Sequence, residues 1–486
     1  MHPTSDWHHT WSRFRPRAEA LVDVATGRRW TWAQTAAESW SWARRLEQEG
    51  VGPGDRVEVL AQNNIDSFAL MFACADRGAI FVPLNWRLSD PEIAYQVGNC
   101  TPKISFVDQS QQGRIPGAFS LEAGAGCDRS PYQGPGSRLS DPWVLMYTSG
   151  TSGKPKGALL THQQLHWNAL NTILACDLGP TDSTLTFTPL FHTGGLNCLS
   201  SPLLHRGGRV VLCSKFDPGE ALALIATERI THLMGVPTIY QMLADHPDFD
   251  RTDLSSVRDA LCGGAPLSLP LLQRYQARGI PLRQGFGLTE VGPNCFSTPP
   301  DRVLQKLGSV GMPIHHIDAR LLRPDGTECG PDEDGELVLG GPAVCSGYWA
   351  NPEATAASIR EGLFYTGDIL RRDADGFFYV RGRLKEMYKS GGENVYPAEV
   401  EAVILTCPGV AQVAVIGVPD VRWGEVGVAF VEPQPGHRLD AAQVSGFLDG
   451  KLARFKLPKK VVVLDTLPRI GSGKIDKQAL KNLETR

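Results

Sequence analysis

Residues 147–157 read Tyr-Thr-Ser-Gly-Thr-Ser-Gly-Lys-Pro-Lys-Gly and directly follow an apolar run at 143–146. The three glycines let the backbone turn tightly and direct its N–H groups toward one anion. The hydroxyl side chains and two lysines add donors and positive charge. The spacing excludes a Walker A loop, because two residues separate Gly150 from Gly153 where that loop requires four. A glycine-rich loop is more often a surface turn, but this density of donors after a buried strand favours phosphate binding.

The sequence on both sides of this loop alternates between strands and helices. The expected helices are 31–49, 65–77 and 221–229, and the expected strands are 56–60, 79–84, 208–213 and 231–235. Such alternation predicts an α/β fold with mainly parallel sheets.

Two segments depart from this pattern. Residues 109–141 are rich in Gly, Ser, Gln and Pro without a sustained period, so we expect a surface excursion there. From Asp318 onward, short alternating segments are separated by turn signals at 324–326, 334–335 and 375–376. This texture predicts a smaller β-rich subdomain.

Composition excludes several function classes. The 486 residues are 42% hydrophobic and 21% charged, and the net charge of −4 gives no electrostatic footprint for nucleic acid. The eleven cysteines include no CxxC pair, which favours reduced thiols in a cytoplasmic protein. Neither a signal peptide nor an apolar run of about 20 residues occurs, so we expect a soluble protein without a transmembrane segment. Peripheral membrane contact stays open.

Further motifs accompany the phosphate-binding loop. They are PLFHTGG at 189–195, CGGAP at 262–266, GFGLTE at 285–290, YTGD at 365–368, GRLKEMYKSGGENVYPAEVE at 382–401 and PRIGSGKI at 468–475. With these motifs, the chain from about Arg17 to Leu480 resembles the adenylate-forming superfamily of acyl-CoA synthetases, luciferases and peptide-synthetase adenylation domains. The resemblance implies that a carboxylic acid attacks Mg²⁺-ATP to give acyl-AMP and pyrophosphate. Coenzyme A (CoA) then attacks the acyl-AMP to give acyl-CoA and AMP.

The resemblance also implies a nucleotide site. The phosphate clamp would be formed by Thr148, Ser149, Gly150, Thr151, Ser152, Gly153 and Lys156. Thr289 would contact the α-phosphate and Glu290 would hold Mg²⁺, because a carboxylate beside phosphates needs a cation between them. The adenine would lie against Gly264, Ala265, Gly285, Phe286 and Gly287, and the ribose would be bound by Asp368 and Arg383. Phe286 stands where the family usually has Tyr, which keeps the stacking face and loses one hydroxyl.

The remaining implied roles concern the catalytic lysine and the thiol. Lys474 would bridge the attacking carboxylate and the α-phosphate, and Lys385 would be the hinge between domains 1–384 and 385–486. The implied architecture is a large N-terminal domain with several subdomains and a small, mobile α+β C-terminal domain. The thiol would approach along Lys389, Gly391 and Gly392. His192 resembles an aromatic gate between the acyl site and the thiol tunnel, and a buried structural histidine is the equal alternative.

Substrate class rests on two positions. The segment after Phe191 lacks the Asp that amino-acid-activating relatives use, which argues against amino-acid substrates. Gly287 stands where acetate-type relatives have Trp, so we expect an open pocket that fits a longer acyl or aryl acid. The segment 382–401 and the compact length look most like fatty acyl-CoA synthetases, which implies a medium- or long-chain fatty acid. The alternatives are an aryl acid or o-succinylbenzoate ligase, a luciferase-like oxidising enzyme or, less favoured, a non-catalytic nucleotide-binding relative. The partners would be small molecules, and a homodimer is one candidate assembly.

Overall fold

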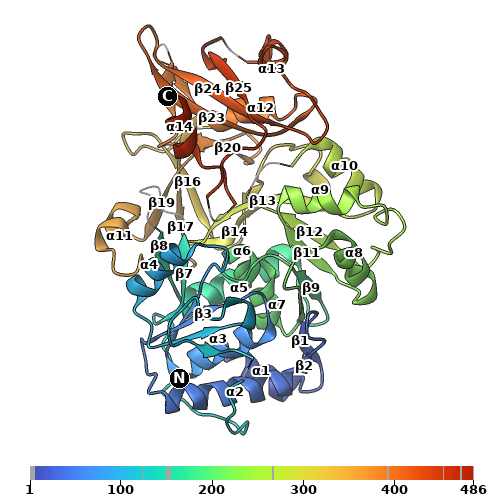
Figure 1. Ribbon diagram of the computed structural model, residues 1–486, viewed down its shortest axis with the longest axis vertical. Coiled ribbons are helices and arrows are strands. Elements are labelled where there is room, and N and C mark those ends of the chain that lie inside the picture. The colour runs from blue at the N-terminus through green and yellow to red at the C-terminus, as the bar shows by residue number, and fades with distance from the viewer. Residues whose placement is uncertain are drawn as a thin grey trace. The chain divides into compact units, whose positions relative to one another are not determined.

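The computed structural model describes residues 6–484 except 123, 149–154, 265–266, 391–392, 453 and 471–472. The chain forms two compact units, which are residues 1–319 with 339–364 and residues 320–338 with 365–486. Figure 1 shows the elements of each unit. This division into units does not show where a hinge lies, so the domain boundary between residues 384 and 385 stays a prediction.

The first unit begins with a six-stranded sheet in the order β6-β5-β3-β4-β7-β8. Its strands are β3 (Arg56–Leu60), β4 (Ile80–Pro83), β5 (Ile104–Val107), β6 (Phe119–Ser120), β7 (Pro142–Thr148) and β8 (Lys156–Thr161). The associated helices are α1 (Trp7–Phe14), α2 (Trp32–Gln48), α3 (Ile65–Arg77) and α4 (Asp90–Cys100). Strands β3, β4, β5 and β6 are parallel, whereas β7 and β8 form an antiparallel pair. This pair carries the two ends of the phosphate-binding motif.

A nine-stranded sheet forms the rest of the first unit, in the order β15-β14-β13-β12-β11-β9-β10-β1-β2. Its strands are β1 (Glu19–Asp23), β2 (Arg29–Thr31), β9 (Ser183–Thr186), β10 (Arg209–Leu212), β11 (His232–Gly235), β12 (Asp259–Cys262), β13 (Leu282–Leu288), β14 (Gly292–Ser297) and β15 (Met312–Pro313). Its helices are α5 (His162–Cys176), α6 (Thr193–Gly195), the π-helix η2 (Leu196–Ser200), α7 (Ser201–Arg206), α8 (Pro218–Thr227), α9 (Pro237–Asp245) and α10 (Leu269–Ala277). Strands β1, β10, β9, β11, β12 and β13 are mutually parallel.

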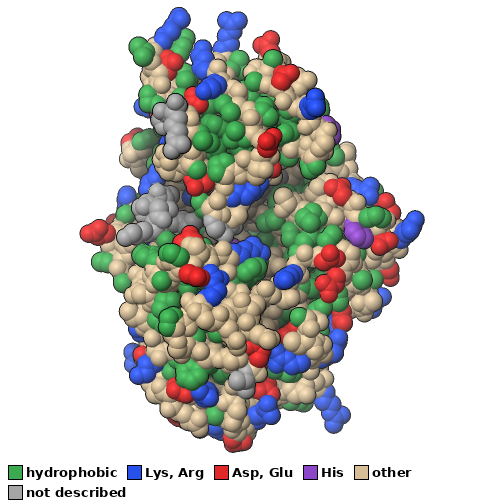
Figure 2. All heavy atoms as spheres, viewed as in Figure 1, with side chains coloured by type: hydrophobic (Ala, Val, Ile, Leu, Met, Phe, Trp, Pro, Cys, Tyr) green, Lys and Arg blue, Asp and Glu red, His purple; other side chains and the backbone are tan. Residues whose placement is uncertain are grey.

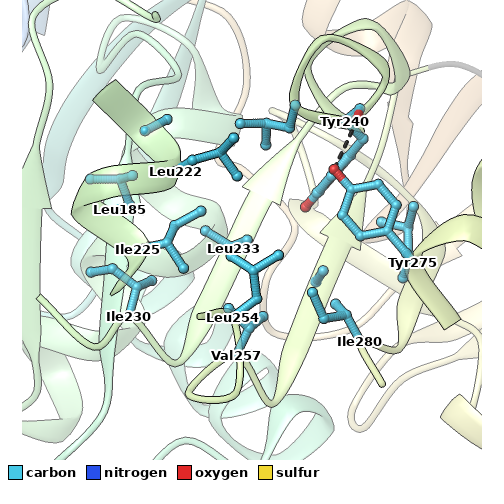
Figure 3. Packing of buried hydrophobic residues seen from close by; sticks show 14 of the residues in the cluster. Leu185, Leu222, Ile225, Ile230, Leu233, Tyr240, Leu254, Val257, Tyr275 and Ile280 are labelled. Carbon is cyan, nitrogen blue, oxygen red and sulfur yellow. Dashed lines mark hydrogen bonds between the residues drawn. The ribbon is translucent and has the colours of Figure 1, made fainter. Parts of the chain in front are cut away.

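Helices α8, α9 and α10 cover one face of this sheet (Figure 1). Their apolar side chains pack on β9, β11 and β12 in a single buried cluster (Figure 3). Within it, the hydroxyl of Tyr275 donates a hydrogen bond to the Tyr240 carbonyl at 2.8 Å, so this buried phenol is satisfied. The cluster fixes the positions of the parallel strands and of the loops that follow them.

The second unit contains two sheets. In the first, β16 (Asp318–Leu322), β17 (Asp334–Gly340) and β19 (Leu363–Arg372) are neighbours and β20 (Phe378–Arg383) pairs with β19. The second sheet has the order β22-β21-β24-β23, with β25 on β24. Its strands are β21 (Tyr388–Ser390), β22 (Glu393–Val395), β23 (Val410–Asp420), β24 (Gly424–Pro433) and β25 (Lys460–Val463), and its helices are α12 (Pro397–Ile404), α13 (Ala441–Leu448) and α14 (Lys477–Glu484).

The predicted fold class is confirmed, and most expected elements are present within one to three residues. One turn was predicted wrongly, because Asp334 and Gly335 begin β17. A Cβ at Gly335 would lie 2.5 Å from the Cys329 sulfur, so this glycine permits close strand packing rather than a turn. Charged side chains of both signs are interspersed on the visible face (Figure 2). Among the described residues, no helix is long and apolar enough to cross a membrane.

Candidate active site

The backbone around Glu290 is fixed by hydrogen bonds from two other parts of the first unit. Glu290 lies in the turn between β13 and β14. The side-chain amide of Gln164, in the first turn of α5, donates to the carbonyls of Thr289 and Glu290 at 3.2 and 3.3 Å. The backbone N–H of Cys345 also donates to the Glu290 carbonyl at 2.7 Å. These contacts hold the Thr289–Glu290 peptide in one orientation, as a preorganised site requires.

The Glu290 carboxylate is held through one of its oxygens. Oε1 accepts a hydrogen bond from the Tyr348 hydroxyl at 2.9 Å and one from the Thr148 hydroxyl at 3.4 Å. Burial, together with the adjacent carboxylate, raises the pKa of Tyr348, so its hydroxyl stays protonated and can only donate to Glu290. The Lys156 ammonium lies 5.2 Å from the centre of the Tyr348 ring. Thr148 and Lys156 face each other across β7 and β8.

This arrangement fits a magnesium-bound phosphate chain. The second carboxylate oxygen, Oε2, makes no hydrogen bond within the described residues, and Mg²⁺ prefers such oxygens. The Thr289 hydroxyl is half-buried and has no hydrogen-bond partner in the same set. Lys156 supplies positive charge at the end of the loop. The predicted clamp residues Ser149, Gly150, Thr151, Ser152 and Gly153 lie outside the described residues.

The predicted adenine-binding residues lie at the ends of β12 and along β13. Gly264 has a φ of +84°, a conformation that favours glycine, whereas Ala265 lies outside the described residues. A Cβ at Gly285 would be 2.8 Å from the Phe296 carbonyl oxygen, so β13 and β14 approach too closely there for a side chain. The Phe286 ring meets Phe296 edge-on at 5.9 Å. Contact of these residues with adenine stays a prediction.

The interpretation of Gly287 needs a correction. We expected its missing side chain to leave an acyl pocket open. A Cβ at Gly287 would instead lie 2.1 Å from the carbonyl oxygen of Pro293 on β14. The glycine is therefore required by the close approach of two strand backbones, and a Trp there could not be accommodated without moving β14. Chain-length preference cannot be derived from this position.

His192 lies at the start of a short helical segment. It is the residue before the short helix α6, and η2 follows directly. Single-turn π-helices of this kind occur frequently at functional sites. The ring is half-buried and lies 4.5 Å from that of Phe191, so both the gate and the structural histidine stay open alternatives. The gating role stays a prediction.

The second unit brings the two predicted ribose residues together. Asp368 on β19 lies opposite Arg383 on β20 in the strand register. Arg383 donates from Nε to the Asp368 carboxylate at 2.8 Å. The Asp368 side chain is 5% exposed and that of Arg383 is 45% exposed. An arginine that orients this carboxylate is consistent with the predicted contact to a ribose, which stays a prediction.

The predicted lysines of the second unit are exposed. Lys385 lies between β20 and β21, and the N–H of Lys389 on β21 donates to Glu425 at 2.9 Å. The Ile470 N–H donates a hydrogen bond to the Lys474 carbonyl at 2.9 Å. Gly391 and Gly392 lie outside the described residues.

Two contact residues of Glu290 were missed from the sequence. Tyr348 lies outside every quoted motif and reaches the site because it pairs with Ala158 in an isolated β-bridge. Gln164 follows the phosphate-binding motif by seven residues, at the start of α5. Its amide acts on backbone carbonyls, a role that leaves no distinctive sequence pattern.

The fold and this site are typical of a phosphate-handling enzyme: the Glu290 carboxylate accepts a hydrogen bond from Tyr348, and the Lys156 ammonium lies beside the Tyr348 ring. The AMP-binding enzyme model matches residues 8–349, and the AMP-binding enzyme C-terminal domain model matches residues 399–474. The chain therefore belongs to the AMP-binding enzyme family. It is an acid–thiol ligase, and ATP, Mg²⁺ and CoA are the cofactors and co-substrates of this class.

Two curated relatives and one solved structure illustrate the similarity. A feruloyl-CoA synthase of an Amycolatopsis species is 43% identical, with 96% of each chain covered. A long-chain-fatty-acid–CoA ligase of Mycobacterium tuberculosis is 34% identical over 96% of this chain and 95% of that protein. The structure of o-succinylbenzoate CoA synthetase from Bacillus subtilis with ATP and a magnesium ion has a TM-score of 0.91, with 31% identity and 99% of each chain covered.

Proposed function

We propose that this protein joins an aromatic carboxylic acid to CoA through an acyl-AMP intermediate. The observation that carries the ligase chemistry is the Glu290 carboxylate, held by Tyr348 and Thr148 beside Lys156. The first step brings a carboxylate anion against a phosphate anion, so charge neutralisation and positioning dominate its barrier.

The roles of the residues follow from their contacts. Tyr348 and Thr148 donate to one Glu290 oxygen, and the other would bind the metal ion. Mg²⁺ held by Glu290 would withdraw charge from the phosphate oxygens. Lys156 would neutralise the phosphates that leave as pyrophosphate, and the Thr289 hydroxyl would donate to the α-phosphate. Lys474 would approach the attacking carboxylate from the second unit, and His192 would separate the acid from the incoming thiol.

The aromatic substrate class is supported by the relatives. Ferulate is an aromatic acid, and the feruloyl-CoA synthase shares 43% identity with this chain, against 34% for the long-chain-fatty-acid ligase. The o-succinylbenzoate CoA synthetase also acts on an aromatic acid. We therefore propose an aryl acid substrate in place of the fatty acid that the sequence motifs predicted. The buried thiols also support a reducing, cytoplasmic compartment.

Pyrophosphate release from ATP and Mg²⁺ tests the proposal, with ferulate, indoleacetate, o-succinylbenzoate, decanoate and palmitate compared with and without CoA. We expect the highest kcat/KM for an aromatic acid and AMP as the nucleotide product. A kcat/KM for palmitate higher than that for every aromatic acid would overturn the aromatic assignment and support the fatty acid prediction instead. ADP as the product would overturn the adenylate route itself.

A further inference from the structure

An arginine-rich groove lies at the amino ends of the parallel strands in the nine-stranded sheet. It has a volume of about 930 Å³ and is lined by residues at or just before the starts of β1, β2, β9, β10, β11 and β12. In Figure 1, β1, β2 and β9 lie together on one side of the first unit. We refer to this cavity as the arginine groove.

The arginine groove is separate from the candidate active site. His192 and Gly264 follow the carboxyl ends of β9 and β12, whereas Ser183 and Arg258 of the groove lie at the amino ends of the same two strands. Because these strands are parallel, the two sets of residues occupy opposite edges of one sheet. The proposed ligase reaction therefore makes no use of the groove.

Two of the five arginines in the groove are fully engaged by carboxylates. Arg29 donates to Glu19 at 2.6 Å and to Glu228 at 2.9 Å. Arg209 donates to the same two carboxylates at 3.1 and 2.9 Å. These two arginines and two carboxylates form a neutral network. Their mutual ion pairs give them a structural role, so they need no ligand to account for them.

The other three arginines keep unused donors. Arg15 donates from Nη1 to the carbonyls of Pro180 and Gly207 and contacts no carboxylate among the described residues. Arg258 uses Nη2 for Asp182, and its side chain is 53% exposed. Arg229 is exposed and makes no side-chain hydrogen bond to any described residue.

The resulting charge is unusual for this chain. The groove contains five arginines and three carboxylates, a net charge of +2, in a protein whose overall net charge is −4. Hydroxyl side chains of Thr181, Ser255 and Ser256 line it as well. A guanidinium with free N–H groups matches phosphate and carboxylate oxygens in a two-point hydrogen bond.

We propose that the arginine groove binds a small multivalent anion through its phosphate or carboxylate groups. Arg15, Arg229 and Arg258 supply the charged donors, and the hydroxyls complete the contacts. The Arg29–Glu19–Arg209–Glu228 network occupies Glu19 and Glu228, so Asp182 on Arg258 is the one remaining carboxylate among the described residues that line the groove. A bound anion of two or more charges neutralises the excess positive charge of the groove.

Isothermal titration with pyrophosphate and with citrate, at ionic strength held constant with chloride, tests this site. The variants are Arg229→Gln alone and Arg229→Gln with Arg258→Gln. Arg251→Gln is the matched control, because Arg251 is also exposed and lies outside the groove. We expect about tenfold weaker binding for each guanidinium removed, and unchanged binding for the control.

Arg229→Gln alone should leave the protein folded, because Arg229 makes no side-chain hydrogen bond to any described residue. A loss of binding in this variant would therefore report on the groove and not on unfolding. An effect on pyrophosphate alone identifies a phosphate ligand, and an effect on citrate alone identifies a carboxylate ligand. Equal affinity of wild type and both variants for both probes would overturn the proposal, as would the absence of binding to the wild type. Acid-dependent pyrophosphate release by the same proteins reports the ligase function separately, and we expect it to be unchanged in the variants.

Discussion

Tyr348 orients the Glu290 carboxylate by a hydrogen bond. Mutating each residue in turn therefore distinguishes the positioning of the carboxylate from its proposed binding of Mg²⁺. Glu290→Ala removes the carboxylate oxygens that we propose hold Mg²⁺ and should abolish magnesium-dependent turnover. Tyr348→Phe removes one hydrogen bond to a charged group, so kcat should fall about tenfold to a hundredfold. Steady-state kinetics at saturating ATP and Mg²⁺ measure both effects.

Tyr379→Phe is the matched control for Tyr348. Its hydroxyl also donates to a carboxylate, that of Asp373 at 3.2 Å, but in the second unit away from Glu290. We expect kcat to change less than twofold there, roughly as for other surface substitutions. An equal loss in both Tyr variants would mean that Tyr348 acts on stability and not on the site.

His162 predicts how stability depends on pH. Its ring is stacked on Trp143 at 4.9 Å, and neither ring nitrogen has a partner within the described residues. Burial lowers the pKa of His162 to about 4. Below the ordinary histidine pKa of about 6.5, His162 is protonated in the unfolded chain but stays neutral in the folded chain. The free energy of unfolding therefore falls as the pH drops from about 6.5 to about 4. The loss amounts to about 3 kcal/mol over that window.

Urea unfolding between pH 7.5 and 4.5 measures this effect. His162→Phe keeps the stacked ring and removes the titration, so its stability should fall less on acidification than that of the wild type. His437→Phe replaces an exposed histidine and should follow the wild-type profile. Identical pH profiles for the wild type and His162→Phe would refute the assignment.

At the scale of elements, the sequence predicted those helices and strands whose ends are set by neighbouring residues. The helix at 65–77 was predicted to the residue because Asn64 accepts the Ser67 N–H at its start and Gly78 has a φ of +67° at its end. Gly287 and Gly335 were misinterpreted because their constraint comes from outside their own strand: the Pro293 backbone on β14 for Gly287 and the Cys329 sulfur for Gly335. Strand-to-strand distance depends on tertiary packing, which a single sequence does not display. Tyr348 was missed for the same reason.

The pairing of β19 with β20 carries a prediction about ATP binding. Asp368 and Arg383 face each other across these strands, with Nε and Oδ1 2.8 Å apart. If the carboxylate binds ribose in the ground state, Asp368→Asn should raise the KM for ATP about tenfold and change kcat little. Asp373→Asn, on the loop of the same hairpin, should leave both constants near wild type. An unchanged KM for ATP in Asp368→Asn would remove the ribose assignment.

At the scale of the whole molecule, the predicted catalytic groups are divided between the two units. Glu290, Thr289, Lys156 and His192 belong to the first, and the second carries Asp368, Arg383, Lys385, Lys389 and Lys474. The sequence motifs supplied these residues through the family resemblance, and their catalytic and binding roles stay predictions. Lys385 lies within the motif at 382–401, but that motif does not show how the backbone there moves, so the hinge also stays a prediction.

An ion pair spans the predicted hinge. Arg381 precedes Lys385 and Glu399 follows it, and their side chains meet at 3.1 Å. Glu399 also accepts from Lys456 at 2.6 Å. A rotation at Lys385 that carried Glu399 away would break the first contact and keep the second. If Lys385 is the hinge, this ion pair joins the chain on either side of it, and a rotation there would require the pair to open.

The two half-reactions should consequently be separable by mutation. Lys474→Ala removes the charge that we propose reduces carboxylate–phosphate repulsion, so adenylate formation should fall by roughly 100-fold or more while CoA attack on supplied acyl-AMP is nearly retained. Lys385→Pro fixes φ near −65° and should allow adenylate formation but block the change of pose that thioester formation needs. Single-turnover assays from ATP plus acid, and from synthetic acyl-AMP plus CoA, measure the halves separately. If both variants lowered both half-reactions equally, the hinge and the lysine would act in one shared step, and the two-pose mechanism would not apply to this protein.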